Sequence, residues 1–302
     1  MFGTREEFPY YECARCGCLW IARVPDDLSR QYGAGYYSLK ESALRMFVRR
    51  HPALYRAAHY ARHHGPPSLP EWWPSKQLSL DAAILDVGSG VGRLLLHLKS
   101  LGYTNLVGVD PFIAEDIRLP NGPAIFKRSI EEIDGQFELV IMNHSLEHIA
   151  DSRRVFDELK RLLAPSGLAV IRTPVASSFA WRKYGPDWVQ LDAPRHLVVH
   201  TVDSIGALSK TSALSLEAVT HDSTAFQFWG SEQYRRDIPL MDTRSYLISA
   251  RNSIFTRSEI DEFTRRAKEL NQRGEGDQAS FYLRHQASVD EAPHRLDSAH
   301  TE

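Results

Sequence analysis

The fold of this chain is decided by the stretch Leu85-Asp86-Val87-Gly88-Ser89-Gly90-Val91-Gly92-Arg93. An apolar run from Ala82 precedes the glycines, and the helical pattern Leu94-Leu95-Leu96-His97-Leu98 follows them. This order predicts a strand, a tight glycine-rich turn and a helix whose N-terminus faces a nucleotide-like ligand. Dinucleotide-binding loops have the spacing G-x-G-x-x-G, which brings a pyrophosphate onto the helix end. The tighter G-x-G-x-G spacing, with Asp86 beside it, favours a ligand without a pyrophosphate and with a cationic end.

Strands and helices alternate along the chain from this turn onward. The run 137–142 (FELVIM) is apolar in the way expected of a strand that is buried on both faces. The expected strands are 82–87, 105–110, 124–127, 137–142, 168–172, 214–219 and 279–284. The expected helices are 93–101, 152–163 (ended by Pro165-Ser166-Gly167), 201–210 and 259–271. Such alternation predicts an α/β fold with a doubly wound, mostly parallel sheet.

The pattern divides the chain into three regions. Residues 1–75 form an N-terminal region with three cysteines, the aromatic run Tyr32–Tyr37 and a helix expected from about Leu39 to His64. Proline-rich segments then break regular structure before the main domain, which we expect over 76–285. The polar segment 286–302 is expected to be a disordered tail.

Composition limits the classes of partner. The chain has 302 residues, of which 43% are hydrophobic, and a net charge of −2. This balance argues against binding to nucleic acid or to an anionic membrane surface. No apolar run approaches the ~20 residues of a membrane-spanning helix, and the N-terminus lacks the apolar stretch of a secretory signal. We therefore expect a cytoplasmic protein, with its oligomeric state left open.

The three cysteines lie within six residues of one another, at Cys13, Cys16 and Cys18. This odd, local set excludes a disulfide framework. Cys13-x-x-Cys16 is typical of half a zinc site, and Cys18 could supply a third thiolate. Because a second Cys-x-x-Cys pair is absent, the cluster is interpreted either as a zinc site or as reduced thiols.

The carboxyl ends of parallel strands are where ligands bind in open α/β sheets. The first expected strand ends at Asp86 and the glycine turn, and the second ends at Asp110, whose carboxylate is suited to two ribose hydroxyls. The other residues expected to contact this ligand are Gly88, Ser89, Gly90, Gly92, Pro111, Ser129, Ile130, Asn143 and His144.

These motifs resemble those of class I S-adenosylmethionine-dependent methyltransferases. The resemblance rests on Asp86-x-Gly88-x-Gly90-x-Gly92, on Asp110 and on Ser145-Leu146-Glu147-His148-Ile149. The segment Leu191–Leu197 (LDAPRHL) and the N-terminal cysteines are similar to a branch related to the ubiquinone-pathway O-methyltransferases. The resemblance implies S-adenosylmethionine as cofactor and a seven-stranded Rossmann-like sheet whose last strand is antiparallel. That strand would follow an insertion at 221–276.

Methyl transfer to an oxygen or nitrogen atom calls for a general base, and histidine is suited to that role. Three histidines are candidates: His148 and His144 after the fourth strand, and His196 after the fifth. In some ubiquinone-pathway relatives the positions that match His144, Glu147 and His148 bind a divalent metal, although His144 replaces an expected acid. The aromatic segments 179–188 and 226–229 are interpreted either as walls of an acceptor pocket or as core.

The sequence thus predicts a methyltransferase that acts on a small molecule, at oxygen rather than nitrogen. A glycan, a nucleotide-sugar or another secondary metabolite is the expected acceptor class. Two alternatives remain open. A nicotinamide-dependent oxidoreductase would need G-x-G-x-x-G, and Arg93 occupies the position of the last glycine. A non-catalytic protein with a retained methyltransferase fold is the other.

Overall fold

A computed structural model of the chain describes residues 6–27, 51, 53–55, 57, 59, 68–74, 78–119 and 122–286. The aromatic run Tyr32–Tyr37, most of the helix expected from about Leu39 to His64 and all but the first residue of the expected tail lie outside these residues.

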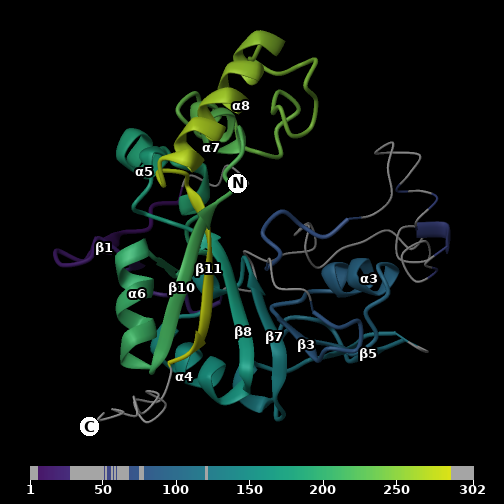
Figure 1. The fold of residues 1–302 in the computed structure, drawn as a ribbon. Coiled ribbons are helices and arrows are strands. Elements are labelled where there is room, and N and C mark those ends of the chain that lie inside the picture. The colour runs from purple at the N-terminus through teal and green to yellow at the C-terminus, as the bar shows by residue number, and fades with distance from the viewer. Residues whose placement is uncertain are drawn as a thin grey trace, which may run out of the picture.

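The main sheet has eight strands in the order β10-β11-β8-β7-β3-β4-β6-β5 (Figure 1). The strands from β6 to β8 run parallel, whereas β11 is antiparallel to both β8 and β10. The strands are β3 (Ile84–Val87), β4 (Leu106–Val109), β5 (Ile117–Arg118), β6 (Ala124–Phe126), β7 (Phe137–Asn143), β8 (Leu163–Pro174), β10 (Leu214–His221) and β11 (Gln278–His285). The prediction of a doubly wound, mostly parallel sheet with an antiparallel last strand is confirmed.

Two details differ from the expected sheet. An eighth strand, β5, pairs with β6 at the sheet edge; its two residues are too few to show any periodicity in the sequence. In addition, α4 (Ser152–Leu162) ends one residue early, and the segment expected to end it forms the start of β8. Pro165 has no amide hydrogen, so it cannot donate a regular hydrogen bond to a neighbouring strand. It is exposed, and the pairing of β8 with β7 is irregular opposite the stretch between Phe137 and Leu139, so a proline is tolerated in this part of β8.

The apolar run of β7 is buried on both faces, as its sequence predicts. Val140 and Met142 point into a core cluster with α4, whereas Leu139 and Ile141 point into a second cluster with α3 (Arg93–Ser100). Alternation along a strand places neighbouring side chains on opposite faces. The sheet is therefore the middle layer between two helical layers, and its carboxyl edge is where the connecting loops meet.

Four more α-helices follow β8 in the described part of the chain. They are α5 (Phe179–Tyr184), α6 (Val202–Thr211) and, between β10 and β11, the pair α7 (Phe226–Tyr234) and α8 (Arg257–Gln272). Thr201 caps α6 as expected, since its side chain accepts a hydrogen bond from the Ser204 amide. Figure 1 shows α7 and α8 standing beyond the carboxyl edge of the sheet. In the described part of the chain, no helix is both long and apolar enough to cross a bilayer.

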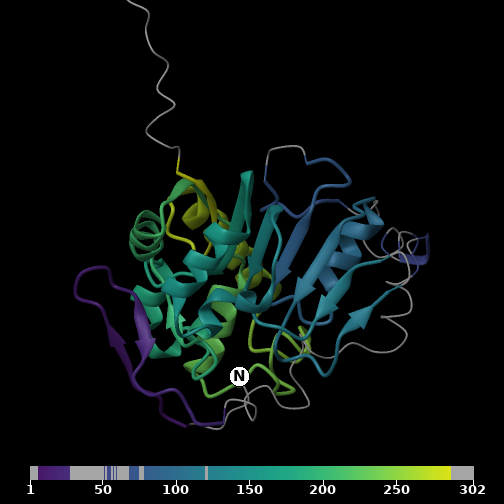
Figure 2. The same ribbon diagram turned by 90° about the horizontal axis from the view of Figure 1, so that it is seen from below.

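A small second sheet joins the N-terminus to the main domain (Figure 2). It has the order β1 (Tyr10–Glu12), β2 (Leu19–Ile21) and β9 (Val198–Val199). The Tyr10 hydroxyl donates to the His196 carbonyl at 2.6 Å, and the Thr201 hydroxyl donates to the Cys16 carbonyl at 2.7 Å. The N-terminal hairpin is thus fastened to residues 196–201.

The position of β11 between β8 and β10 generates a stability prediction. Phe281 is fully buried in the core cluster that β11 shares with α4. Replacing it with alanine should lower the free energy of unfolding by about 3–5 kcal/mol, because a large side chain is lost and a cavity remains. Urea denaturation followed by circular dichroism measures the change. As a control, Leu80→Ala removes a side chain that is 54% exposed and should cost less than about 0.5 kcal/mol. Equal losses would show that β11 does not close the core.

Candidate active site

The glycine turn between β3 and α3 has a backbone that requires glycine. Gly88, Gly90 and Gly92 all have positive φ, at 76°, 53° and 78°. At Gly88 a Cβ atom would also lie 2.4 Å from the Cβ of Ser145, so this position excludes any side chain on two grounds. The turn therefore brings the loop after β3 into direct contact with the loop after β7.

Asp110 holds the glycine turn in place. Its buried carboxylate accepts hydrogen bonds from the Gly90 amide at 2.9 Å and from the Phe112 amide at 2.8 Å. Each carboxylate oxygen can accept a further bond. The end of β4 and the loop after β3 are thereby locked together, with acceptor capacity left for a ligand.

Asp86 is a buried carboxyl group without a cationic partner. It is 3% exposed, and burial together with the nearby Asp110 raises its pKa to about 7. Within the described residues, no hydrogen bond or ion pair reaches its carboxylate. A ligand that brings a positive charge would stabilise the ionised form. Asp86 therefore fits the ammonium end of S-adenosylmethionine.

A cavity of about 530 Å³ opens at this edge of the sheet, a size typical of small-molecule sites. Of the eleven residues predicted to contact the cofactor, ten line it, and Gly92 instead forms the start of α3. The buried Ser145 hydroxyl, also on its wall, has no hydrogen-bond partner in the described chain. The lining residues that the sequence reasoning did not single out are Val87, Arg93, Leu94, Val109, Phe112, Arg128, Glu131, Ser145, Ile149 and Ala150.

Most of the missed residues are of types that occur throughout the chain, so nothing in a single sequence marks them as cofactor contacts. Phe112 is the exception, since an aromatic residue follows Asp110 by two positions and is 55% exposed at the cavity. By contrast, the aromatic segments interpreted as possible pocket walls are largely core. Trp188 and Phe228 are fully buried in one apolar cluster.

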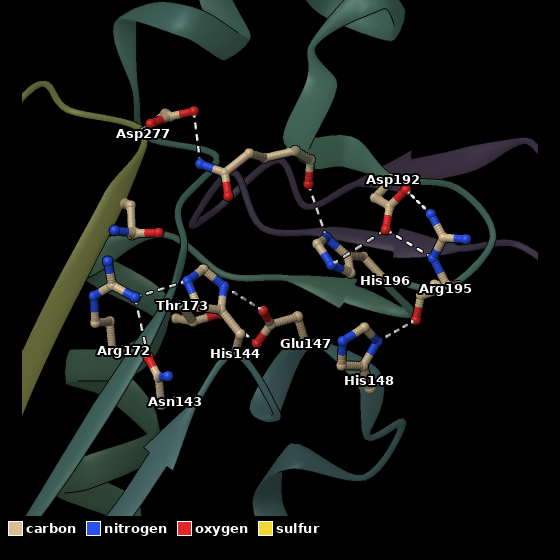
Figure 3. A network of polar contacts seen from close by, with 12 residues as sticks. Asn143, His144, Glu147, His148, Arg172, Thr173, Asp192, Arg195, His196 and Asp277 are labelled. Carbon is tan, nitrogen blue, oxygen red and sulfur yellow. Dashed lines mark hydrogen bonds and ion pairs between the residues drawn. The ribbon is translucent and has the colours of Figure 1, made fainter. Parts of the chain in front are cut away.

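Beside the cavity lies a buried carboxylate, that of Glu147, which is 0% exposed. It accepts hydrogen bonds from His144 Nδ1 at 3.2 Å and from the Thr173 hydroxyl at 2.9 Å (Figure 3). Burial pushes the pKa of Glu147 upward, but the bond from His144 and the three nearby imidazoles outweigh burial and hold the pKa below its usual range. Glu147 is therefore a fixed negative charge among histidines.

His144 has its basic nitrogen engaged. Its Nε2 lies 2.9 Å from Arg172 Nη1, and a guanidinium can only donate, so the imidazole proton is on Nδ1. That proton is donated to Glu147. His144 also has φ 54°, which is uncommon for a residue other than glycine and marks backbone strain at this turn.

His148 and His196 meet beside Glu147, from loops 48 positions apart in sequence. Their ring centroids are 4.9 Å apart in an edge-on arrangement. The Nδ1 of His148 lies 2.9 Å from the Arg195 carbonyl, and that of His196 lies 2.8 Å from the Gln190 carbonyl. Carbonyls only accept, so Nδ1 carries a proton in each ring, and Nε2 is the nitrogen that can accept one. Burial and the neighbouring His148 lower the pKa of His196 to about 4.

A buried network outside the predicted set supports His196. Asp277, just before β11, accepts hydrogen bonds from Trp188 Nε1 at 2.9 Å and from Gln190 Nε2 at 2.8 Å. Gln190 in turn offers its carbonyl to His196. Figure 3 shows Asp277 and His196 together with the ion pair between Asp192 and Arg195. These residues come together because the segment after β8 returns across the edge of the sheet. The sequence of that segment has no periodic pattern from which its path could be predicted.

Three of these side chains have the chemistry of metal ligands. Glu147, His148 and His196 each place one donor atom within 4.8 Å of the others, and imidazole with carboxylate suits several divalent metals. The resemblance pointed to His144 with Glu147 and His148; the structure groups His196 with them instead.

The N-terminal cysteines also converge. Cys13, Cys16 and Cys18 place their sulfur atoms within 4.8 Å of one another at the tip of the β1–β2 hairpin. The backbone amides of Cys16 and Arg15 lower the pKa of the Cys13 thiol, whereas burial raises that of Cys18 to about 12. Three converging sulfurs fit a zinc ion that takes its fourth ligand from elsewhere.

Comparison with known proteins places the chain in a family. A family model for a methyltransferase domain matches residues 58–218, more than half of the chain, and the chain belongs to this family. The chain thus contains a methyltransferase domain with the class I fold, whose members use S-adenosylmethionine.

Two curated relatives and one solved structure illustrate the range of similar proteins. Ubiquinone biosynthesis O-methyltransferase of Caulobacter sp. (strain K31) is 28% identical over 118 residues, 35% of this chain and 47% of that protein. EEF1A lysine methyltransferase 2 of Homo sapiens is 30% identical over 95 residues, 30% of this chain and 39% of that protein. The chain thus spans less than half the length of either relative. A cyclopropane synthase from Mycobacterium tuberculosis superimposes with a TM-score of 0.43 at 14% identity, covering 67% of this chain and 78% of that chain.

The environment of Asp86 predicts pH-dependent binding of the cofactor. An ammonium group binds the ionised carboxylate, and with a pKa of about 7 Asp86 gains a proton as the pH falls. The affinity for S-adenosylhomocysteine should therefore drop about tenfold from about pH 7.5 to about pH 6. Titration calorimetry measures it.

Asp86→Asn should bind more weakly at the higher pH and lose this dependence. The fully exposed Asp134 offers a matched control, since Asp134→Asn should keep it. The same pH dependence in Asp86→Asn would show that another group is responsible.

The cysteine cluster predicts a metal content. Protein purified under reducing conditions should contain a single zinc ion per chain by elemental analysis, and Cys13→Ser should lose it, because one thiolate ligand is removed. Zinc-free protein with three thiols that react with a thiol reagent would instead support the interpretation as reduced cysteines.

Proposed function

We propose that the protein transfers the methyl group of S-adenosylmethionine to an oxygen atom of a small molecule, such as a glycan, a nucleotide-sugar or another secondary metabolite. The observation that carries this proposal is His148, which lines the cofactor cavity with its Nδ1 fixed by the Arg195 carbonyl. When bound, the cofactor supplies an electrophilic methyl carbon on a sulfonium. A neutral hydroxyl attacks such a carbon more readily when a nearby base accepts its proton.

His148 is the best placed of the three histidines for that base. Its Nε2 can accept the acceptor proton, and the Glu147 carboxylate nearby would stabilise the resulting imidazolium. His144 is less suited because Arg172 donates to its basic nitrogen. His196, whose pKa lies at about 4, stays neutral near pH 7 and is assigned to positioning the His148 ring.

The acceptor is tested by following the methyl group. The protein is incubated with S-adenosylmethionine labelled in the methyl group and with a phenol, a nucleotide-sugar or a protein extract. We expect label in a hydroxylated small molecule, as a methyl ether by mass spectrometry. Label confined to lysine side chains would overturn the proposal in favour of the activity that the human relative's name describes. Cofactor binding without transfer to any acceptor class would favour a non-catalytic protein.

The assignment of His148 predicts a large kinetic effect. His148→Gln should lower kcat by about 10²–10⁴-fold, because the base is lost, while leaving the affinity for S-adenosylhomocysteine within about twofold. Steady-state kinetics and calorimetry measure the two quantities. His285, at the opposite edge of the sheet, gives a matched control, since His285→Gln should turn over normally.

Two outcomes would contradict this role. An acid limb of kcat/KM near pH 4 would reassign the base to His196, because that is where its pKa lies. We also expect turnover to survive prolonged treatment with a chelator. Activity that Cys13→Ser, which lacks the full cysteine ligand set, also loses to the chelator and regains with a divalent cation would indicate that Glu147, His148 and His196 hold a metal.

A further inference from the structure

The loop between α7 and α8 exposes an unusual number of large apolar side chains. We call residues 235–257 the cap loop; it runs from the end of α7 to the first residue of α8. Met241, Leu247, Ile248 and Ile254 are 50%, 56%, 48% and 40% exposed. The described chain exposes seven other large apolar residues, of which Tyr11, Trp20 and Val24 lie in the N-terminal segment and the rest are far apart in sequence. Four such side chains thus lie within fourteen residues of one loop, and exposed apolar side chains that gather in this way mark interaction surfaces.

The cap loop is anchored from within, so its outward residues are held in place. Leu240 and Phe255 are buried in an apolar cluster with Trp229, and Tyr246 packs against that cluster. The buried Gln233 donates to the Ser245 hydroxyl at 3.1 Å and accepts from the Tyr246 amide at 2.8 Å. The next residues form one helical turn, in which the Ile248 and Ser249 amides both donate to the Ser245 carbonyl. Leu247 and Ile248 are therefore presented together at the tip of a fixed turn.

The cap loop is positively charged. The cap loop has five arginines and two aspartates, a net charge of +3, although the whole chain has −2. Asp242 is already paired with Arg244 inside the loop. Arg251 and Arg257, on either side of Ile254, are exposed. The charge of the whole chain argued against an anionic surface, but the local charge has the opposite sign.

The cap loop stands on the acceptor side of the molecule. Figure 1 shows it with α7 and α8 beyond the carboxyl edge of the sheet. It is also joined to that side by packing, because α7 contacts the turn Val189–Leu191, which leads directly to the Asp192–His196 segment. Whatever covers the cap loop is thus brought to the same end of the molecule as His196.

We propose that the cap loop docks on an anionic lipid bilayer, with Leu247 and Ile248 among the acyl chains and the arginines at the headgroups. Exposed apolar side chains flanked by cations are the combination by which proteins bind such interfaces. A second protein chain is a poorer fit, because a stable interface covers about 800 Å² on each partner. The exposed apolar surface here is limited to a few side chains on one loop. The proposal is independent of the acceptor's identity.

Vesicle sedimentation with the full chain tests this proposal. Binding is compared between vesicles of phosphatidylcholine alone and vesicles that also contain phosphatidylglycerol. We expect binding only to the anionic vesicles, weakened by high salt. The double variant Leu247→Ser/Ile248→Ser should bind at least about tenfold more weakly. Arg251→Gln and Arg257→Gln should each lose about fivefold.

The control variant is Leu80→Ser, which removes an equally exposed leucine ahead of β3, at the opposite edge of the sheet. It should bind vesicles like the unmodified protein, and circular dichroism checks that every variant is folded. Failure to bind anionic vesicles, or equal binding by the double variant, would overturn the proposal. A dimer in analytical ultracentrifugation that the double substitution dissociates, without vesicle binding, would instead assign the loop to a second copy of the chain.

Discussion

The arrangement of the active site depends on one buried negative charge, the carboxylate of Glu147. An ion without water around it is tolerated only when donors surround it, and here Thr173 and His144 supply the hydrogen bonds. The same residue offers its backbone carbonyl to the Leu197 amide at 2.7 Å. A single position thus fixes the ends of β7 and β8 and the returning segment that contains His196. Removing the charge would leave its donors unpaired in the protein interior.

The two halves of the site are built on different principles. The cofactor half is made by backbone geometry, in glycines with positive φ and an aspartate that clamps their amides. The half that we propose for the acceptor is made by side chains from distant segments, held by carbonyls and by the buried Asp277 network. A rigid cofactor half suits a ligand that all members of a family bind. An acceptor half assembled from loops can change substrate without altering the sheet, because loops tolerate substitution better than core strands do.

The sequence predicted the parts that depend on local patterns. The glycine turn, Asp110 and the strand β7 can each be recognised from a few neighbouring residues in the sequence. The structure has the turn and the strand buried on both faces at the expected residues. It could not show that His196 meets His148, because that contact depends on how residues 175–200 return across the sheet edge. Gln190 and Asp277 were missed for the same reason. The cap loop was missed because composition averages over the chain, whereas a surface is decided by which side chains a fixed turn leaves outside.

The strand order has a consequence for how the protein forms during translation. β10 ends at His221, but its neighbour β11, which also pairs with β8, begins only at Gln278. At roughly 5–20 residues per second, a ribosome needs several seconds to make the intervening chain. Throughout that interval β8 has an open edge and β10 has no partner, and open edges invite pairing between chains. The nascent protein is therefore most prone to aggregate just before its last described strand is made.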